Sequence, residues 1–314
     1  MAYYLGIDGG GSKTTCVVGD EASILASVTV GASNITRVGE AGAREALQRA
    51  IRQACLGAKI DPRQVLRACI GAAGTGREEI ASTVHKIVAE IISGEIDVVG
   101  DMEIALAAAF GEGPGVIVIA GTGSIAFGRD AERKTARAGG WGFAISDEGS
   151  AHWIGCAAVS AVLRAADEVG EYQAERDPSW PATRLFGELK TAWRLESLPE
   201  LARAANANAE FALLFPGILA AAEAGDRVAR QVIADASSEL AQLAGIVTRR
   251  LFPEQHSSAA SAVPMAMAGG VFRHGAMIRE LFYNEVRAAN PDVVLNPEVV
   301  DPVHGALQTA RRAG

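Results

Sequence analysis

Residues Ile7–Thr14 read Ile-Asp-Gly-Gly-Gly-Ser-Lys-Thr and separate two short apolar runs, 3–8 and 14–19. Apolar runs bounded by glycine predict two β-strands joined by a tight turn. A turn without Cβ atoms lets the backbone approach a ligand closely, and its amide groups can bind anionic oxygens. This stretch therefore predicts a β-hairpin whose tip could bind phosphate, although an ordinary tight turn would have the same letters.

A related stretch occurs in the middle of the chain. Residues Ile119–Ser124 read Ile-Ala-Gly-Thr-Gly-Ser, so both stretches share the pattern Ile-x-Gly-x-Gly-Ser. The second also lies between two predicted strands, 116–120 and 124–128, and a third glycine cluster follows the apolar run 263–268. The matching hairpin context favours an internal duplication over a chance match.

Composition limits the class of protein. The chain has 314 residues, about twice the ~150 expected for one domain. Apolar residues make up 49% and the net charge is −8, which gives no electrostatic reason to expect nucleic acid or a membrane surface as a partner. Four scattered cysteines, no basic leader and no apolar run near ~20 residues predict a reduced, cytoplasmic, globular protein.

The order of predicted elements indicates two α/β domains. Further strands are expected at 27–30, 68–72, 96–100 and 292–295, and helices at 40–57, 77–92, 102–110, 150–168, 275–289 and 303–312. The segment 184–251 has helical periodicity throughout. A linker at Gly111–Gly115 divides the chain into domains 1–114 and 115–314. The second domain is expected to carry a helical insertion, 175–251, and the last helix, 302–314, could pack back on the first domain.

Two common nucleotide motifs do not fit. A P-loop requires Gly-Lys-[Ser/Thr], but Ser12 precedes Lys13 and a strand follows where a helix should begin. The dinucleotide pattern fails because Thr14 and Ala126 stand where the third glycine should be. Lys13 could contact a phosphate or be a solvated turn residue.

Further motifs extend the pattern to the end of the chain. They are Gly139-Gly-Trp-Gly142, Ser146-Asp-Glu-Gly-Ser150, Ala268-Gly-Gly270 and Pro302-Val-His-Gly-Ala306. Together with the two hairpins, these residues resemble the BadF/BadG/BcrA/BcrD-type ATPase family of the actin/hexokinase/Hsp70 superfamily, and within it the N-acetylglucosamine kinases. The resemblance implies an α/β fold of two ribonuclease-H-like domains with a central cleft for ATP and Mg²⁺, and a homodimer.

The resemblance also implies roles for individual residues. It implies ATP contacts from Asp8, Gly9, Gly10, Gly11, Ser12, Lys13, Thr14, Gly121, Thr122, Gly123, Gly269 and Gly270. It implies Mg²⁺ near Asp8, through water. It implies sugar contacts from Asn34, Asp101, Thr122, Gly123, Gly140, Trp141 and Asp147.

Asp101 has two interpretations from its position alone. It follows the predicted strand 96–100 and precedes a helix, so it could cap that helix or serve as a base at the end of a strand. The resemblance favours a catalytic aspartate that accepts the proton of a sugar hydroxyl. Asp147 could likewise cap the helix that follows it or bind sugar hydroxyls, and Trp141 could be a core residue or a wall for the sugar ring.

We expect ATP-dependent phosphorylation of N-acetylglucosamine or a related amino sugar at O6. One departure matters: after Gly-Thr-Gly-Ser the animal N-acetylglucosamine kinases carry Asn, whereas this chain has Ile125, so a glucosamine kinase is an alternative. An ATPase activator of a 2-hydroxyacyl-CoA dehydratase is disfavoured because only Cys156 follows the second hairpin. A non-enzymatic sugar sensor with a DNA-binding module is disfavoured because the first hairpin begins by residue 8.

Overall fold

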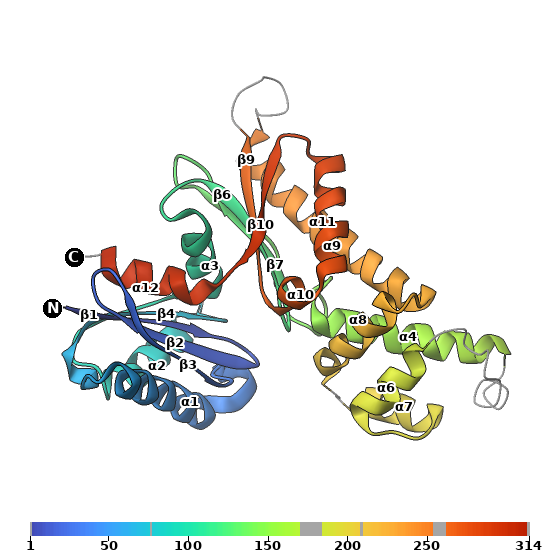
Figure 1. The fold of residues 1–314 in the computed structure, drawn as a ribbon, viewed down its shortest axis with the longest axis horizontal. Helices are drawn as coiled ribbons and strands as arrows, with labels where there is room; N and C mark the ends of the chain where they lie inside the picture. The colour runs from blue at the N-terminus through green and yellow to red at the C-terminus, as the bar shows by residue number, and fades with distance from the viewer. Residues whose placement is uncertain (1, 76, 170–183, 208–209, 254–261, 313–314) are drawn as a thin grey trace. The chain divides into compact units, whose positions relative to one another are not determined.

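The computed structural model describes residues 2–75, 77–169, 184–207, 210–253 and 262–312 (Figure 1). Two compact units make up the chain: residues 1–117 with 300–314, and residues 118–299. The first unit contains one five-stranded sheet, and most of a second five-stranded sheet belongs to the second unit. Helices pack against both sheets. The predicted α/β class with two sheets is therefore confirmed.

The first sheet combines an antiparallel meander with parallel strands. Its order is β3-β2-β1-β4-β5, and β1 pairs antiparallel with β2 and parallel with β4. β2 pairs antiparallel with β3, and β4 pairs parallel with β5. The strands are β1 (Tyr3–Gly9), β2 (Lys13–Gly19), β3 (Ile24–Gly31), β4 (Val65–Ala72) and β5 (Glu95–Gly100). The carboxyl ends of β1, β4 and β5 consequently share one edge of the sheet.

Helices cover both faces of this sheet (Figure 1). On one face, α1 (Ile35–Ala58) and α2 (Glu78–Ala89) bury an aliphatic core that includes Leu5, Ile7 and Ile70. On the other face, α3 (Asp101–Phe110) and α12 (Pro302–Arg312) pack against Tyr4 and its neighbours. A single turn, η1 (Pro62–Gln64), precedes β4.

Glycine allows the last helix to pack directly on backbone. A Cβ on Gly6 of β1 would lie 2.5 Å from the amide nitrogen of Leu307. A Cβ on Gly305 would overlap the backbone of α3 at Ile104 and Ala108. Both contacts are tighter than any real Cβ contact, so α12 lies against β1 and α3 at backbone distance.

The second sheet has the order β10-β9-β6-β7-β8, with β7 antiparallel to β8. Its strands are β6 (Gly115–Ala120), β7 (Ser124–Arg129), β8 (Thr135–Gly139), β9 (Val263–Ala268) and β10 (Val293–Val300). The helices of this half are α4 (Ala151–Val169), α6 (Leu185–Trp193), α7 (Leu198–Asn206), η2 (Phe211–Leu214), α8 (Phe215–Glu223), α9 (Arg227–Leu251), α10 (Gly270–His274) and α11 (Ala276–Ala289). The long helix α9 packs against β7, β8 and α11 (Figure 1).

Most predicted elements are present, with two informative differences. Strand β8 was not predicted, since its letters, Thr-Ala-Arg-Ala-Gly, lack large apolar residues. Helix α1 begins at Ile35, ahead of the predicted start at 40, because a first turn precedes a break at Gly39 with φ 71°. Residues 175–183 of the predicted helical insertion lie outside the described part of the chain. Within the described residues, none of the helices combines the length and hydrophobicity needed to cross a bilayer.

Replacing Gly305 by alanine tests the tight packing of α12. The added Cβ would overlap the backbone of α3, so α12 must shift, and overpacking of this kind costs about 1–3 kcal/mol. Gly187, inside α6, is the matched control because a Cβ there meets nothing within 4 Å. Urea unfolding should show Gly305→Ala destabilised and Gly187→Ala unchanged or stabilised by up to about 1 kcal/mol. Equal midpoints for the two variants would contradict the close packing.

Candidate functional site

The first glycine hairpin is fixed at its base by Ser33. The Ser33 amide donates to the Gly10 carbonyl at 3.3 Å, and the Thr14 hydroxyl donates to Ser33 Oγ at 2.7 Å. The Gly10 amide closes the turn by donating to the Lys13 carbonyl at 3.0 Å. Thr14 is fully buried, so the structure places this predicted ATP contact behind the hairpin, where its hydroxyl supports the turn.

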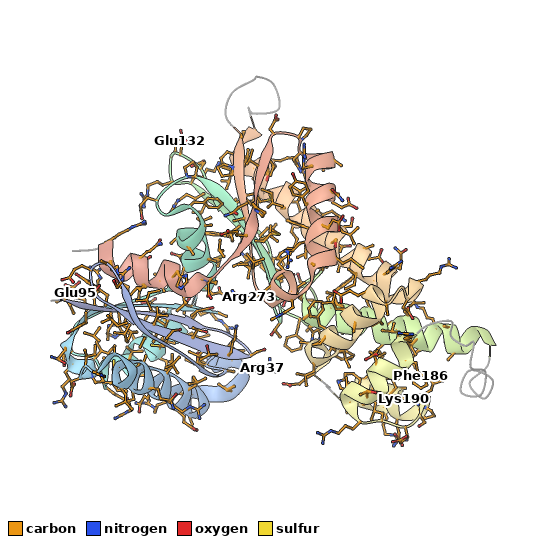
Figure 2. The ribbon with its side chains drawn as sticks, in the orientation of Figure 1. Arg37, Glu95, Glu132, Phe186, Lys190 and Arg273 are labelled. Atoms are coloured by element: carbon orange, nitrogen blue, oxygen red, sulfur yellow. The ribbon has the colours of Figure 1, made fainter. Side chains whose placement is uncertain are left out.

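The tip of this hairpin carries side chains that can reach a ligand. Ser12 and Lys13 are exposed, and Gly11 between them and Gly10 is partly exposed. A Cβ on Gly11 would lie 3.9 Å from Nη1 of Arg37, an arginine on the first turn of α1 (Figure 2). Arg37 thus adds a cation beside a predicted phosphate-binding turn. The sequence did not indicate it, because the predicted helix began after this residue.

Strand register places Asp8 and Asp101 at the same edge of the first sheet. Asp8 pairs with Gly71 of β4, and Ala72 pairs with Gly100 of β5, directly before Asp101. One strand, β4, lies between β1 and β5, so these two strands are about 10 Å apart. Successive side chains alternate between faces, so Asp8 projects on the face of Gly6, which is covered by α12 and α3. Asp8 and the start of α3, where Asp101 lies, therefore share one edge of the sheet, and Asp8 projects on the face that α3 and α12 cover.

Asp101 is the first residue of α3 and not its N-cap. The N-cap is Gly100, whose amide is bound at 3.3 Å by the carboxylate of Glu103, while Asp101 Oδ1 accepts from the Met102 amide at 3.0 Å. Burial raises the pKa of Asp101 above its ordinary value, against the opposing effect of these amide hydrogen bonds, and the charge of Glu103 raises the pKa further. Because Glu103 takes over capping, Asp101 is available for proton transfer with a raised proton affinity.

Asn34 links the first hairpin to the start of α1. It is the N-cap of this helix, and its Oδ1 accepts from the Thr36 amide at 3.0 Å. It directly follows Ser33, which holds the hairpin. The predicted sugar contact is therefore fixed in orientation and lies one residue from the support of the predicted phosphate turn.

The second hairpin is held by the start of α4. The amide of Ala151 donates to the Gly121 carbonyl at 2.9 Å, and that of His152 to the Thr122 carbonyl at 3.4 Å. Within the turn, the Gly121 amide donates to the Gly123 carbonyl at 2.9 Å. These bonds fix the carbonyl groups on the helix side of the turn.

Asp147 lies directly against the second hairpin. A Cβ on Gly123 would lie 2.6 Å from Asp147 Oδ2, so only glycine fits there. Oδ1 accepts from the Gly142 amide at 3.3 Å, and the backbone of Asp147 is left-handed, with φ 66°. Burial raises the pKa of Asp147, and the charge of Glu148 adds to this, while amide hydrogen bonds from Gly142 and Ser124 lower it. The structure thus brings two predicted sugar contacts, Gly123 and Asp147, into contact.

A glycine-rich loop presents Trp141 beside this pair. Gly139, Gly140 and Gly142 have φ values of 72°, 70° and 104°, which favour glycine. Trp141 is 68% exposed, so it is not a core residue. Ile125 packs against Gly140, where a Cβ would lie 2.7 Å from Ile125 Cδ1. The loop therefore offers an aromatic ring and an aliphatic side chain next to the polar groups around Asp147.

The third glycine cluster adjoins the second hairpin. A Cβ on Gly269 would overlap the carbonyl of Ala120, the last residue of β6, and Gly269 has φ 98°. Gly270 begins α10, whose exposed Arg273 is labelled in Figure 2. Gly269, a predicted ATP contact, therefore lies directly beside the start of the predicted second phosphate turn.

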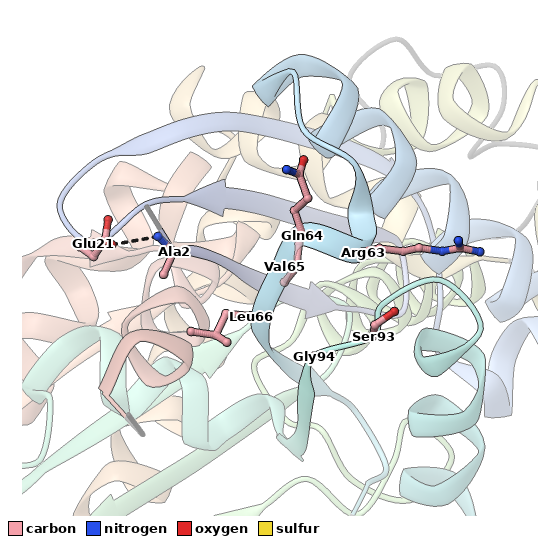
Figure 3. Close-up of a pocket in the computed structure, with 8 residues that line it drawn as sticks. All are labelled: Ala2, Glu21, Arg63, Gln64, Val65, Leu66, Ser93 and Gly94. Carbon is pink, nitrogen blue, oxygen red and sulfur yellow. Dashed lines mark hydrogen bonds between the residues drawn. The ribbon is translucent and has the colours of Figure 1, made fainter.

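The first unit also has a surface hollow that is separate from the predicted site residues. Figure 3 shows it lined by Ala2, Glu21, Arg63, Gln64, Val65, Leu66, Ser93 and Gly94. Most of these residues precede or begin β1, β4 and β5, and Glu21 lies in the turn between β2 and β3, so the hollow lies at the edge of the sheet where β1, β4 and β5 begin. The predicted site residues of the first unit belong to the opposite edge of its sheet, and none of the predicted site residues lines the hollow.

Asp8 is the candidate carboxylate for a metal site. Mg²⁺ is commonly held by one or two carboxylates together with substrate phosphates and water. Asp8 is partly exposed at the end of β1, directly before the glycine hairpin, which fits such a site. Among the described residues, no group of three or more His, Cys, Asp or Glu side chains could hold a metal by itself.

Known proteins resemble this chain over its whole length. An N-acetylmuramic acid/N-acetylglucosamine kinase of Clostridium acetobutylicum is 32% identical, over 99% of each chain. An N-acetyl-D-glucosamine kinase of Dictyostelium discoideum is 28% identical, over 98% of this chain and 97% of that protein. A solved structure from Chromobacterium violaceum, a proposed N-acetylglucosamine kinase, matches with a TM-score of 0.75 at 26% identity, over 98% of both chains.

The fold is shared more widely. A ROK family glucokinase from Streptomyces griseus, solved with glucose and AMPPNP, matches 99% of this chain with a TM-score of 0.58 at 18% identity. The sequence profile of the BadF/BadG/BcrA/BcrD ATPase family matches residues 5–310 and thus includes both hairpins, the loop around Trp141 and most of the last helix. The resemblance inferred from the motifs is confirmed, and the chain belongs to the BadF/BadG/BcrA/BcrD ATPase family.

Proposed function

We propose that this ATP-dependent carbohydrate kinase transfers the γ-phosphoryl group of ATP to O6 of N-acetylglucosamine or a closely related amino sugar. One observation carries the proposal: Asp101 is a partly buried carboxylate with a raised pKa at the sheet edge that also bears Asp8 and the first hairpin. The named activities of the two curated relatives support an amino sugar as the acceptor.

The hairpins provide the phosphate contacts in this proposal. Backbone amides at the two glycine turns, with the side chains of Ser12, Lys13 and Thr122, would bind phosphate oxygens. Asp8 would hold Mg²⁺ through water, and Mg²⁺ would supply charge neutralisation on the transferred group. The guanidinium of Arg37, beside Gly11, adds positive charge at the same turn.

The acceptor would be bound and deprotonated by separate carboxylates. Asp101 accepts the proton of the attacking hydroxyl, a role suited to a carboxylate whose pKa is raised toward the working pH. Asp147, held against Gly123, accepts hydrogen bonds from other hydroxyl groups of the sugar. Asn34 adds an amide and Trp141 an apolar wall.

Ile125 bears on the choice between an N-acylated and a free amino sugar. The Asn of animal N-acetylglucosamine kinases would offer a polar contact, whereas Ile125 packs against Gly140, next to Trp141. An aliphatic side chain beside an exposed indole suits a methyl group better than a charged ammonium. We therefore favour the N-acetylated sugar over glucosamine.

A panel of acceptors tests the proposed substrate. ADP release should be measured with N-acetylglucosamine, N-acetylmuramic acid, N-acetylmannosamine, glucosamine and glucose, and the product identified by phosphorus and proton NMR. An apolar contact to the acyl methyl should favour N-acetylglucosamine over glucosamine by about 10- to 200-fold in kcat/KM. A preference for glucosamine would contradict the N-acyl assignment, and phosphorylation at a hydroxyl other than O6 would contradict the position.

The substitution Asp101→Asn tests the proton acceptor. An amide cannot accept the hydroxyl proton, so kcat should fall by about 10²- to 10⁴-fold while ATP binding, measured by thermal shift, is retained. Asp97→Asn is the matched control, because Asp97 lies on β5 and pairs with Arg67 at 2.8 Å. It should leave kcat within about twofold, because neither Asp97 nor Arg67 is a predicted site residue. Near-normal turnover in Asp101→Asn would remove Asp101 from this role.

The same two variants should differ in how their stability depends on pH. Burial raises the pKa of Asp101, so its ionised form is disfavoured by folding, and it lowers the free energy of unfolding above that raised pKa. Asp101→Asn should therefore have a higher urea midpoint than wild type at pH 7–8, with the gain shrinking as pH falls toward about 4. Asp97→Asn should be neutral or slightly destabilised. A less stable Asp101→Asn at neutral pH would indicate that the ionised carboxylate is stabilised by its partners.

A further inference from the structure

Arg137 contacts both the start and the tip of the loop that carries Trp141. Its guanidinium carbon lies 4.0 Å from the centroid of the Trp141 ring. Its Nη1 donates to the carbonyl of Gly139 at 3.0 Å. One side chain therefore connects the backbone where the loop begins to the indole that the loop presents.

This contact matters because little else in the loop restricts the indole. Gly139, Gly140 and Gly142 all have left-handed backbones, and glycine is the most permissive residue in the chain. Trp141 is 68% exposed, so packing restricts its orientation far less than it would in a core. A cation over the ring face supplies a directional contact that the aliphatic neighbours do not.

Arg137 itself is placed by a regular strand. It lies in β8, opposite Phe127 of β7, and its carbonyl accepts from Nη1 of Arg250 at 3.2 Å. The same ladder pairs Ile125 with Gly139. The guanidinium therefore extends from a rigid base, whereas the loop after it depends on glycine.

We propose that Arg137 is a positioning residue for the amino sugar: by covering one face of the Trp141 indole, it holds the opposite face open for the sugar ring. This inference rests on the proposed function, in which Trp141 is the sugar wall. The inference goes beyond the proposed function, because it assigns the orientation of the Trp141 ring to a residue on β8. A ring fixed before binding saves the entropy of ordering it on binding.

The size of the effect follows from the kind of contact. A cation–π contact at an exposed site corresponds to about a two- to fivefold change in an equilibrium constant. Losing it should raise KM for the sugar by about that factor. KM for ATP and kcat should be unchanged, since the contacts of Arg137 are to the Gly139 carbonyl and the Trp141 ring, on the loop that would bind the sugar.

The test compares Arg137→Met and Arg137→Lys in the wild type and in Trp141→Ala. Methionine keeps a long side chain but removes the charge and the planar group, and lysine keeps the charge alone. Arg137→Met should raise KM for N-acetylglucosamine about two- to fivefold, Arg137→Lys less, and neither should have an effect in the Trp141→Ala background. Lys134→Met is the control, because Lys134 is an exposed cation just before β8. It should leave all constants unchanged.

A fluorescence readout is independent of turnover. Acrylamide quenching of the contribution of Trp141, taken as the difference between each protein and its Trp141→Ala counterpart, should increase in Arg137→Met because the covered face opens. Unchanged quenching would overturn the contact between Arg137 and the Trp141 ring. Equal urea midpoints for wild type and Arg137→Met would show that the variant is folded.

The kinetic outcomes separate this inference from the proposed function. If Trp141→Ala raises KM for the sugar but Arg137→Met does not, the positioning role is overturned and the proposed sugar wall stands. If Trp141→Ala leaves KM unchanged, the sugar wall and the positioning role both fail. If Arg137→Met raises KM for N-acetylmuramic acid alone, the positioning role is also overturned, because Arg137 would then bind the carboxylate of that substrate directly.

Discussion

The candidate site depends on backbone contacts that are closer than a Cβ atom would allow. Gly6 and Gly305 let α12 pack on β1 and α3, Gly269 meets the end of β6, and Gly123 admits the carboxylate of Asp147. The contacts of Gly6, Gly305 and Gly269 bring segments far apart in sequence to backbone distance, where a strand ends or a helix crosses. These glycines therefore do more than make turns: they set the positions of the groups around them.

Two carboxylates, the partly buried Asp101 and the buried Asp147, would make the proposed function compete with stability. Asp101 and Asp147 both have pKa values raised first of all by burial, so each costs stability in its ionised form. Amide groups offset part of this cost, from Met102 for Asp101 and from Gly142 and Ser124 for Asp147. A group whose burial is only partly compensated is a poor structural element, and this supports a chemical role for both.

The sequence predicted secondary-structure elements better than contacts between residues far apart in the chain. Periodicity and glycine punctuation located β1, β2, β6 and both turns, because these signals are local. The contact of Gly123 with Asp147 joins residues 24 positions apart and has no local signal. Arg137 was missed because β8 is a short strand of small and polar residues. The capping interpretation of Asp101 was wrong in its register, since the helix begins at Asp101 itself and Glu103 reaches back to the N-cap.

The proposed base and the proposed sugar wall lie on different kinds of structure, which explains how acceptors could change within the family. The proposed base begins a helix at the end of a strand, a position fixed by sheet pairing. The proposed sugar wall lies instead on a loop with three left-handed glycines, supported by Arg137 and Ile125. Binding loops on a rigid scaffold tolerate substitution better than the scaffold does. A change such as Asn to Ile125 can then alter what surrounds the acyl group while the proton acceptor and the phosphate turns keep their geometry.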